Sequence, residues 1–123
     1  MTSTSQDSEI RIALPWPPSV NMLYENVRGK GRVATKEYVA WKREAGWTLL
    51  AQRPRKFKGP VIIAIELCPP HNRRFDLDNK NKCLLDLLVR HEVIPDDHSE
   101  LVREVNVRRV ENAAPCTVIV RAV

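Results

Sequence analysis

The chain has 123 residues, 43% of them hydrophobic, and a formal net charge of +5 at pH 7. This length can bury one hydrophobic core and is too short for two ordinary domains. Its basic balance favours a polyanionic partner. No apolar run is long enough to span a membrane, so we expect no membrane partner. Three widely spaced cysteines without a C-x-x-C pair argue against a disulfide framework and fit a reducing, cytoplasmic compartment.

The N-terminal segment is predicted to be a frayed tail over residues 1–8, followed by a single domain over residues 9–123. The tail lacks the basic start and apolar stretch of a signal peptide. Residues 10–14 alternate apolar and polar side chains, which predicts a short strand, and three prolines then end it. Trp16 lies among these prolines, and we expect it to cap an edge of the core in preference to stacking on a nucleic-acid base.

Residues 22–35 are predicted to form a loop or ribbon with a basic tip. Arg28, Lys30 and Arg32 alternate with glycines there, but the Gly-Lys-Ser/Thr ending of a P-loop is missing. Two interpretations of this tip remain open: a mobile basic loop that contacts phosphates, or a solvated hairpin turn without such a role. Residues 28–58 carry a net charge of +8 and the rest of the chain −3. This asymmetry is expected of a surface that binds nucleic-acid backbone beside an acidic site.

The remaining elements follow from periodicity. Thr35 is placed to cap an amphipathic helix over residues 36–52, and the β-branched run 61–67 predicts a central strand. Residues 79–90 predict a mostly buried helix with Asp78 as its N-cap. Two strands, 101–111 and 116–123, are expected to pair as a hairpin through the turn 112–115. The order predicts an α/β or α+β fold, a small mixed sheet with two main helices packed on it.

Acidic residues flank the second helix. Asp76 and Asp78 precede it on an irregular turn, and Asp96 and Asp97 follow it. If the helix and its return bring the second pair back to the start of the helix, the carboxylates share one pocket and repel one another unless a cation is bound. Oxygen ligands without paired Cys or His suit Mg²⁺ or Mn²⁺. This hypothesis requires Asp97 to meet Asp76 and Asp78.

A plainer interpretation of the same acids remains open. Asp78, Lys82 and Asp86 are spaced i, i+4, i+8 and would form a surface ladder worth roughly 0.2–0.5 kcal/mol per pair. Asp76 and Asp97 would then be solvated turn residues. An EF-hand is excluded, because the sixth place of such a loop requires Gly and this chain has Asn81.

One motif is the segment 14–19 with Asn21, near the N-terminus. A second motif, more than fifty residues later, is the segment 74–79 with Lys82, Asp86 and the pair Asp96 and Asp97. Together and in this order, the two motifs resemble the RusA family of Holliday junction resolvases. The likeness runs over about residues 10–120.

The resemblance implies a homodimeric, Mg²⁺-dependent endodeoxyribonuclease, with Mn²⁺ as a plausible substitute and no small-molecule cofactor. Such enzymes resolve four-way (Holliday) DNA junctions by paired phosphodiester hydrolysis in recombination and repair, and are often carried by bacteria, phages or prophages. By the same resemblance, Asp76, Asp78 and Asp97 bind the metal and are catalytic together with Lys82. The other expected site residues are Arg28, Lys30, Arg32, Arg73 and Arg74 for DNA contacts, and Asp96 and Asn79 beside the metal ligands.

The chain departs from the family pattern at two positions. Phe75 stands where a basic residue usually precedes the first Asp, and Glu92 stands where the helix usually ends with Gly. Two functions of other classes also stay open: a non-catalytic module that binds branched DNA, and a structural or regulatory dimer whose acids form a salt-bridge network.

Overall fold

The computed structural model describes residues 9–71 and 74–123, so the tail predicted at residues 1–8 lies outside it. A four-stranded mixed sheet has the strand order β1-β6-β4-β5. Strand β4 runs parallel to β5 and antiparallel to β6, which in turn is antiparallel to β1. The strands are β1 (Glu9–Leu14), β4 (Val61–Leu67), β5 (Val102–Arg109) and β6 (Cys116–Ala122).

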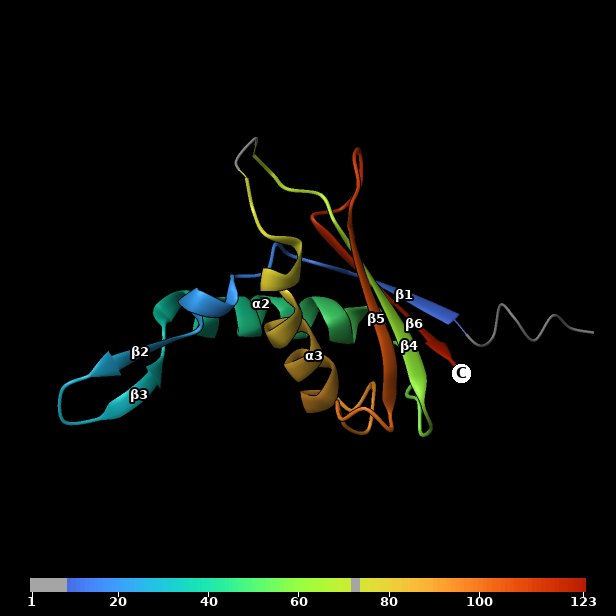
Figure 1. Ribbon diagram of the computed structural model, residues 1–123, viewed down its shortest axis with the longest axis horizontal. Helices are drawn as coiled ribbons and strands as arrows, with labels where there is room; N and C mark the ends of the chain where they lie inside the picture. Colours follow the sequence, from blue (N-terminus) through green and yellow to red (C-terminus); the bar gives the residue numbers. More distant parts are fainter. Residues whose placement is uncertain (1–8, 72–73) are drawn as a thin grey trace, which may run out of the picture.

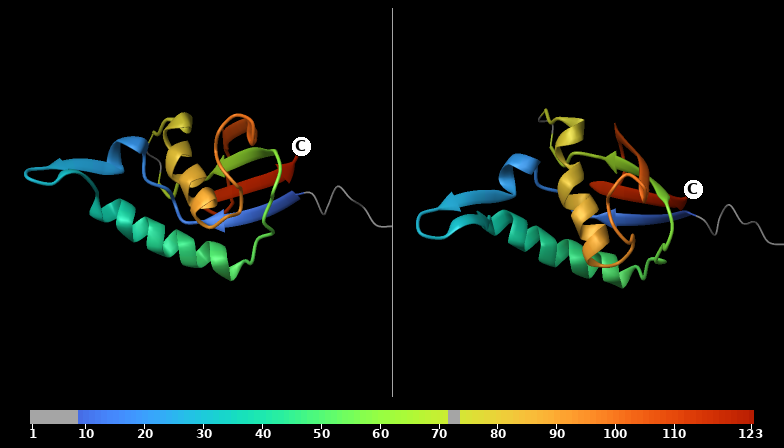
Figure 2. Two further views of the ribbon diagram at one scale, coloured as in Figure 1. Left: turned by 90° about the horizontal axis from the view of Figure 1, so that it is seen from below. Right: turned by 60° about the horizontal axis from the view of Figure 1, so that its bottom comes forward.

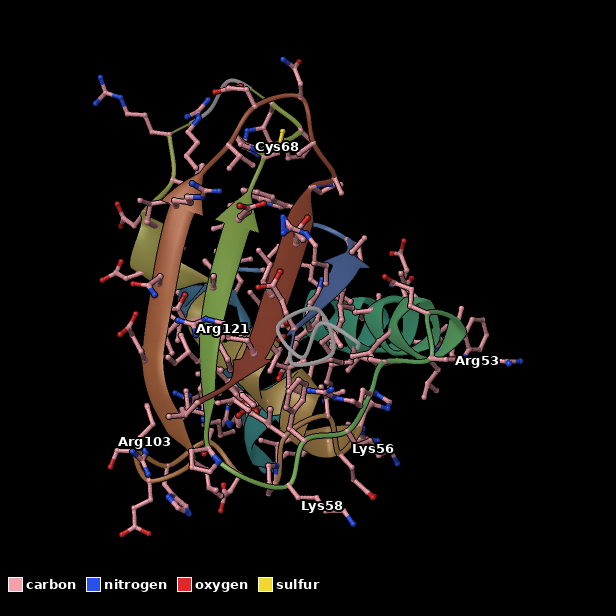
Figure 3. All side chains as sticks on the ribbon, turned by 90° about the vertical axis from the view of Figure 1, so that its right-hand side faces the viewer. Arg53, Lys56, Lys58, Cys68, Arg103 and Arg121 are labelled. Atoms are coloured by element: carbon pink, nitrogen blue, oxygen red, sulfur yellow. The ribbon has the colours of Figure 1, made fainter. Side chains whose placement is uncertain are left out.

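Helices α2 (Lys36–Ala51) and α3 (Asn81–Arg90) pack on one face of this sheet (Figure 1). The core lies between the two layers, because alternate residues of β4 such as Ile63 and Ile65 are fully buried against α3 residues such as Leu84. Figure 3 shows the opposite face of the sheet without a helix over it. The predicted mixed sheet with two main helices is confirmed.

A two-stranded ribbon extends away from the sheet at the start of α2 (Figure 2). It consists of β2 (Tyr24–Val27) and β3 (Gly31–Ala34), preceded by the short 3₁₀ helix η1 (Val20–Met22). Gly29 and Gly31 adopt φ angles of 81° and 77°, in the region that favours glycine. The ribbon predicted at residues 22–35 is confirmed. The cap is confirmed too: Thr35 Oγ1 accepts a hydrogen bond from the backbone N–H of Tyr38.

The predicted hairpin between the last two strands is wrong, because β4 lies between β5 and β6. The connecting segment 110–115 passes over the end of β4. There the backbone N–H of Val110 donates to the carbonyl of Leu67, and that of Cys68 donates to the carbonyl of Pro115. An apolar strand gains most burial when it is paired on both sides. Strand β4 obtains this position by lying between β5 and β6, the next two strands in the sequence.

The helix that follows the first acidic pair begins later than predicted. A 3₁₀ turn, η2 (Leu77–Asn79), comes first, closed by a hydrogen bond of 3.1 Å from the Asn79 N–H to the carbonyl of Asp76. Lys80 then stands at the N-cap of α3 without a side-chain cap bond, so Asp78 is not the cap. At the other end Glu92 has a φ of 61°, the left-handed conformation that glycine usually supplies there.

The three cysteines, all within the described residues, are free. Cys83 and Cys116 are buried, and burial raises the pKa of each thiol to about 12, so both remain neutral. Cys83 and Cys116 belong to the hydrophobic core, whereas Cys68 is only partly buried.

The open face of the sheet carries one buried acid. The side chain of Glu66 is 11% exposed and accepts hydrogen bonds from Arg108 and from Arg11, the latter at 3.5 Å. The hydrogen bond from Arg108 lowers the pKa of Glu66 below its usual 4.5, against the opposing effect of burial. A carboxylate with a depressed pKa stabilises the fold above its unfolded-state pKa, and this contribution is lost as the pH falls through the lower, folded-state pKa.

We therefore expect Glu66→Gln to lower the free energy of unfolding at pH 7 by about 1–2 kcal/mol. The stability curve of the variant should also fall less steeply below pH 4.5, the ordinary pKa of this group. Urea unfolding between pH 3 and pH 7 measures both effects. Glu104→Gln is the matched control on the same face, because that exposed carboxylate hydrogen-bonds only the neighbouring Asn106 among the described residues. Equal pH profiles for Glu66→Gln and the unmodified chain would contradict the assignment.

Candidate functional site

The first acidic pair lies on the turn between β4 and α3. Asp76 and Asp78 are both exposed, one just before η2 and one within it. A pocket of about 320 Å³ opens beside Asp76. Its lining residues are Ser19, Arg74, Phe75, Asp76, Asn79 and Lys80. The opening motif and the acidic motif, far apart in the sequence, therefore meet at this pocket.

Trp16 contacts one of the residues that line this pocket. Its ring packs edge-on against Phe75, with centroids 5.1 Å apart, and against His71 at 6.0 Å. The predicted role at the edge of the core is thus confirmed for Trp16, which packs against the hydrophobic core. Phe75 is an aromatic wall of the pocket at the position where a basic residue was expected from the family pattern.

Lys82 is paired with an acid of its own helix. Its Nζ atom lies 3.3 Å from Asp86 Oδ1, and 57% of the Lys82 side chain is exposed. Of the two ion pairs in the predicted surface ladder, the i, i+4 pair between Lys82 and Asp86 is therefore present. An exposed pair of this kind is worth roughly 0.2–0.5 kcal/mol, so little free energy holds the ammonium group in this position.

The second acidic pair lies at the other end of α3. Asp96 and Asp97 belong to the loop that leads into β5, where the backbone N–H of Val102 donates to the carbonyl of His98. Figure 1 shows η2 (yellow) and this loop (orange) at opposite ends of α3. Arg103, just after the loop, and Cys68, on the side of η2, mark the two ends of the sheet in Figure 3. Because α3 has ten residues, its ends lie about 15 Å apart at roughly 1.5 Å per residue.

The expected convergence of carboxylates is therefore not found within one chain. Over residues 9–71 and 74–123, no three His, Cys, Asp or Glu side chains are grouped so that they could hold a metal ion. For the carboxylates to meet, the chain after α3 would have to run back along the helix to its start. Instead, Val93 and Ile94 bury their side chains at its C-terminal end, and the Val93 carbonyl accepts a hydrogen bond from the backbone N–H of Phe57. This packing holds Asp97 far from Asp76.

Asp76 and Asp78 by themselves still offer the kind of ligands that Mg²⁺ prefers. Mg²⁺ is usually bound through one or two carboxylates, with water and substrate phosphates completing its shell. Asp76 and Asp78 supply two exposed carboxylates two residues apart, beside the amide-bearing Asn79. These residues fit that cation without a third acid from the same chain.

The cations expected to contact DNA fall into separate groups. Arg28, Lys30 and Arg32 are exposed on the β2–β3 ribbon, and the Arg32 guanidinium lies 4.8 Å from the centroid of the Tyr24 ring. Arg74 is exposed at the rim of the pocket, whereas Arg73 lies outside the described residues.

The basic residues of the region 28–58 are spread along the whole length of α2. Arg53, Lys56 and Lys58 lie on the segment after α2 (Figure 3), at the end of that helix opposite to the ribbon. The 16 residues of α2 separate the two groups by about 24 Å. Lys42 and Arg43 of the helix lie between them.

Lys80 lines the pocket beside Asp76 but was not among the site residues predicted from the sequence. It lies within the string of Lys and Asn residues after Asp78, and nothing in that polar string distinguishes it from an exposed lysine. In the structure it is 7% exposed, and burial lowers the pKa of its ammonium group.

Within the described part of the chain, no helix has the length and apolar composition needed to cross a membrane.

An exposed carboxylate pair beside cationic side chains on a small α+β domain is typical of proteins that act on nucleic-acid phosphates. The chain belongs to the Endodeoxyribonuclease RusA family, whose model matches residues 15–121. This confirms the resemblance inferred from the two motifs.

Several relatives of known name share this similarity. The crossover junction endodeoxyribonuclease RusA of Escherichia coli (strain K12) is 36% identical over 86 residues, which cover 70% of this chain and 72% of that protein. The enzyme of the same name from Enterobacteria phage 82 is 34% identical over the same shares of both chains. The one from Shigella sonnei (strain Ss046) is also 34% identical over 86 residues.

Proposed function

We propose that this chain is a structure-selective endodeoxyribonuclease that resolves four-way DNA junctions by paired phosphodiester hydrolysis, in recombination and repair. Its family and the names of its relatives support this function. The observation that carries the proposal is the exposed pair Asp76 and Asp78 beside the cationic pocket, within the segment that the family model matches.

Mg²⁺, with Mn²⁺ as a substitute, is the proposed cofactor, held by Asp76 and Asp78 and completed by Asp97. When bound, such an ion polarises the scissile phosphate and lowers the pKa of a water molecule enough to supply hydroxide near neutral pH. In the overall reaction water adds across one P–O bond of the backbone, which leaves one phosphate end and one hydroxyl end.

Lys82 is the proposed electrostatic catalyst. Its weak pair with Asp86 is easily exchanged for a phosphate oxygen, because a charge-assisted hydrogen bond to phosphate is stronger than an exposed i, i+4 pair. The ammonium group then stabilises the negative charge that develops on the phosphate or the leaving oxygen. Asp96 and Asn79 orient their neighbours: Asp96 Oδ1 accepts a hydrogen bond of 2.8 Å from the backbone N–H of Asp97.

In this conformation, Asp97 joins the other two acids if a second copy of the chain supplies it. A two-fold axis perpendicular to α3 and near its middle reverses the direction of the helix, and so places the end of one copy beside the start of the other. We therefore propose a homodimer in which Asp97 of one subunit completes the site at Asp76 and Asp78 of its partner. Two equivalent sites then cut two strands symmetrically, as a four-way junction requires.

DNA contacts outside the site are proposed for two surfaces. Arg28, Lys30 and Arg32 of the ribbon reach beyond the body of the molecule and suit phosphates of a junction arm. Arg73 and Arg74 precede Asp76 and suit phosphates next to the scissile one. The relatives come from bacteria and a phage, so we place this activity in the cytoplasm of a bacterium or in a phage-infected cell.

The proposal is tested by incubating a labelled synthetic four-way junction and a matching linear duplex with the protein, with and without Mg²⁺. We expect symmetrical cuts in the junction only with Mg²⁺ and no cuts in the duplex. Junction binding without any product would instead identify a non-catalytic branched-DNA module. Equal affinity for junction and duplex, without cleavage, would favour a structural or regulatory dimer.

A further inference from the structure

Lys80 is a largely buried lysine that has no anionic partner among the residues that the structure describes. Only 7% of the residue is exposed, and over residues 9–71 and 74–123 it has no hydrogen bond or ion pair from its ammonium group. Its contact is the face of Trp16, with Nζ 4.9 Å from the ring centroid. Among the described residues it is the only Lys or Arg that is buried.

The burial applies to the aliphatic stem of Lys80 more than to its ammonium group. Among the described residues, Asn81 Oδ1 is the only buried side-chain nitrogen or oxygen atom without a hydrogen-bond partner, so Lys80 Nζ still reaches water. The packed stem and a contact with the Trp16 ring, worth roughly 0.5–2 kcal/mol, hold the ammonium group in place. An ammonium group fixed beside a pocket, with no acid paired to it among the described residues, is placed to bind an anionic ligand.

The surroundings of Lys80 indicate where that ligand lies. Its side chain lines the pocket that contains Asp76 and a second pocket of about 310 Å³, and Ser19 lines both. The second pocket is otherwise walled mainly by apolar groups, among them Trp16 and Trp41. One cation thus stands between a polar site for the scissile phosphate and an apolar recess.

We propose that Lys80, with Ser19 beside it, binds a backbone phosphate of the DNA strand next to the phosphate held at Asp76. This inference rests on the proposed nuclease function and adds a DNA-phosphate site to it. The bound phosphate neutralises the ammonium group of Lys80, and the apolar recess beyond it accommodates the adjoining sugar. The strand then runs from Asp76 past Lys80 towards Trp16. In this role Lys80 positions the strand and takes no part in the bond that breaks.

The salt dependence of DNA binding tests this site. Each phosphate neutralised by a cation adds about 0.9 to the slope of log affinity against log salt concentration. We expect Lys80→Met to reduce this slope by about one and to weaken junction binding roughly five- to tenfold in 0.1 M salt. Fluorescence anisotropy of a labelled junction without Mg²⁺ measures both, because no strand is cut under these conditions.

Three companion measurements separate binding from folding. Lys80→Arg should keep the slope, because it keeps the charge. Lys58→Met, an exposed lysine at the opposite end of β4 (Figure 3), should leave the slope unchanged. Thermal unfolding of Lys80→Met should occur at about the same temperature as in the unmodified chain, because Met keeps most of the length and the apolar character of the packed stem.

An unchanged slope for Lys80→Met, or a much lower unfolding temperature, overturns the phosphate site and assigns Lys80 to support of Trp16. This result leaves the proposed function intact if the unmodified chain still cuts junctions with Mg²⁺. Conversely, a chain that binds junctions and never cuts them overturns the proposed nuclease, while the slope comparison still decides the role of Lys80.

Discussion

Asp76→Asn should lower the rate of junction cleavage in Mg²⁺ by at least roughly a thousandfold, because it removes one of the charges proposed to hold the ion at the scissile phosphate. Junction affinity should stay equal or rise, since a negative charge facing phosphate is lost. Asp76 is exposed, so the free energy of unfolding should change by less than about 0.5 kcal/mol. Single-turnover cleavage of a labelled junction measures the rate, and anisotropy without metal measures the affinity.

The same outcome is expected for Asp97→Asn and for Lys82→Ala. Glu44→Gln is the matched control, because it neutralises an exposed acid on the outer side of α2 and should leave the cleavage rate unchanged. Full activity in any of the three site variants would remove that residue from the proposed centre. Loss of activity together with loss of junction binding would point instead to a misfolded variant, which the unfolding measurement detects.

A heterodimer of one Asp76→Asn subunit and one Asp97→Asn subunit should regain activity that neither homodimer has. If each site takes Asp76 and Asp78 from one subunit and Asp97 from its partner, one of the two sites in this heterodimer carries both substitutions and the other carries none. The intact site should nick one strand of the junction at about half the total rate of the unmodified dimer. Co-expression with two affinity tags isolates the heterodimer for this assay.

The matched control is a heterodimer of Asp76→Asn with Asp78→Asn. Both substitutions fall on the same turn, so each of its two sites keeps one defect and no activity should return. A silent Asp76→Asn and Asp97→Asn heterodimer would show that Asp97 acts within its own chain. The loop 95–101 would then have to move towards η2 when DNA binds.

Local features of this chain could be predicted from its sequence because they depend on neighbouring residues. The Thr35 cap needs only the N–H of Tyr38 three residues later, and the β2–β3 ribbon needs only glycines that tolerate positive φ. The run 61–67 was placed at the centre of the sheet because its β-branched side chains suit burial on both faces. The two spaced motifs also carried the family resemblance, which the family match over residues 15–121 confirms.

Positions that depend on distant partners were decided only by the tertiary structure. The pairing of β4 with both β5 and β6 overrode the short turn 112–115, because the gain from burying a central strand exceeds that of a local hairpin. Burial of Val93 and Ile94 holds Asp97 a helix length from Asp76, although the two acids belong to one sequence motif. Lys80 is packed against the ring of Trp16, which lies 64 residues earlier in the chain. Residue types and their spacing were enough to propose which side chains carry the chemistry, whereas long-range packing decided which of those side chains meet.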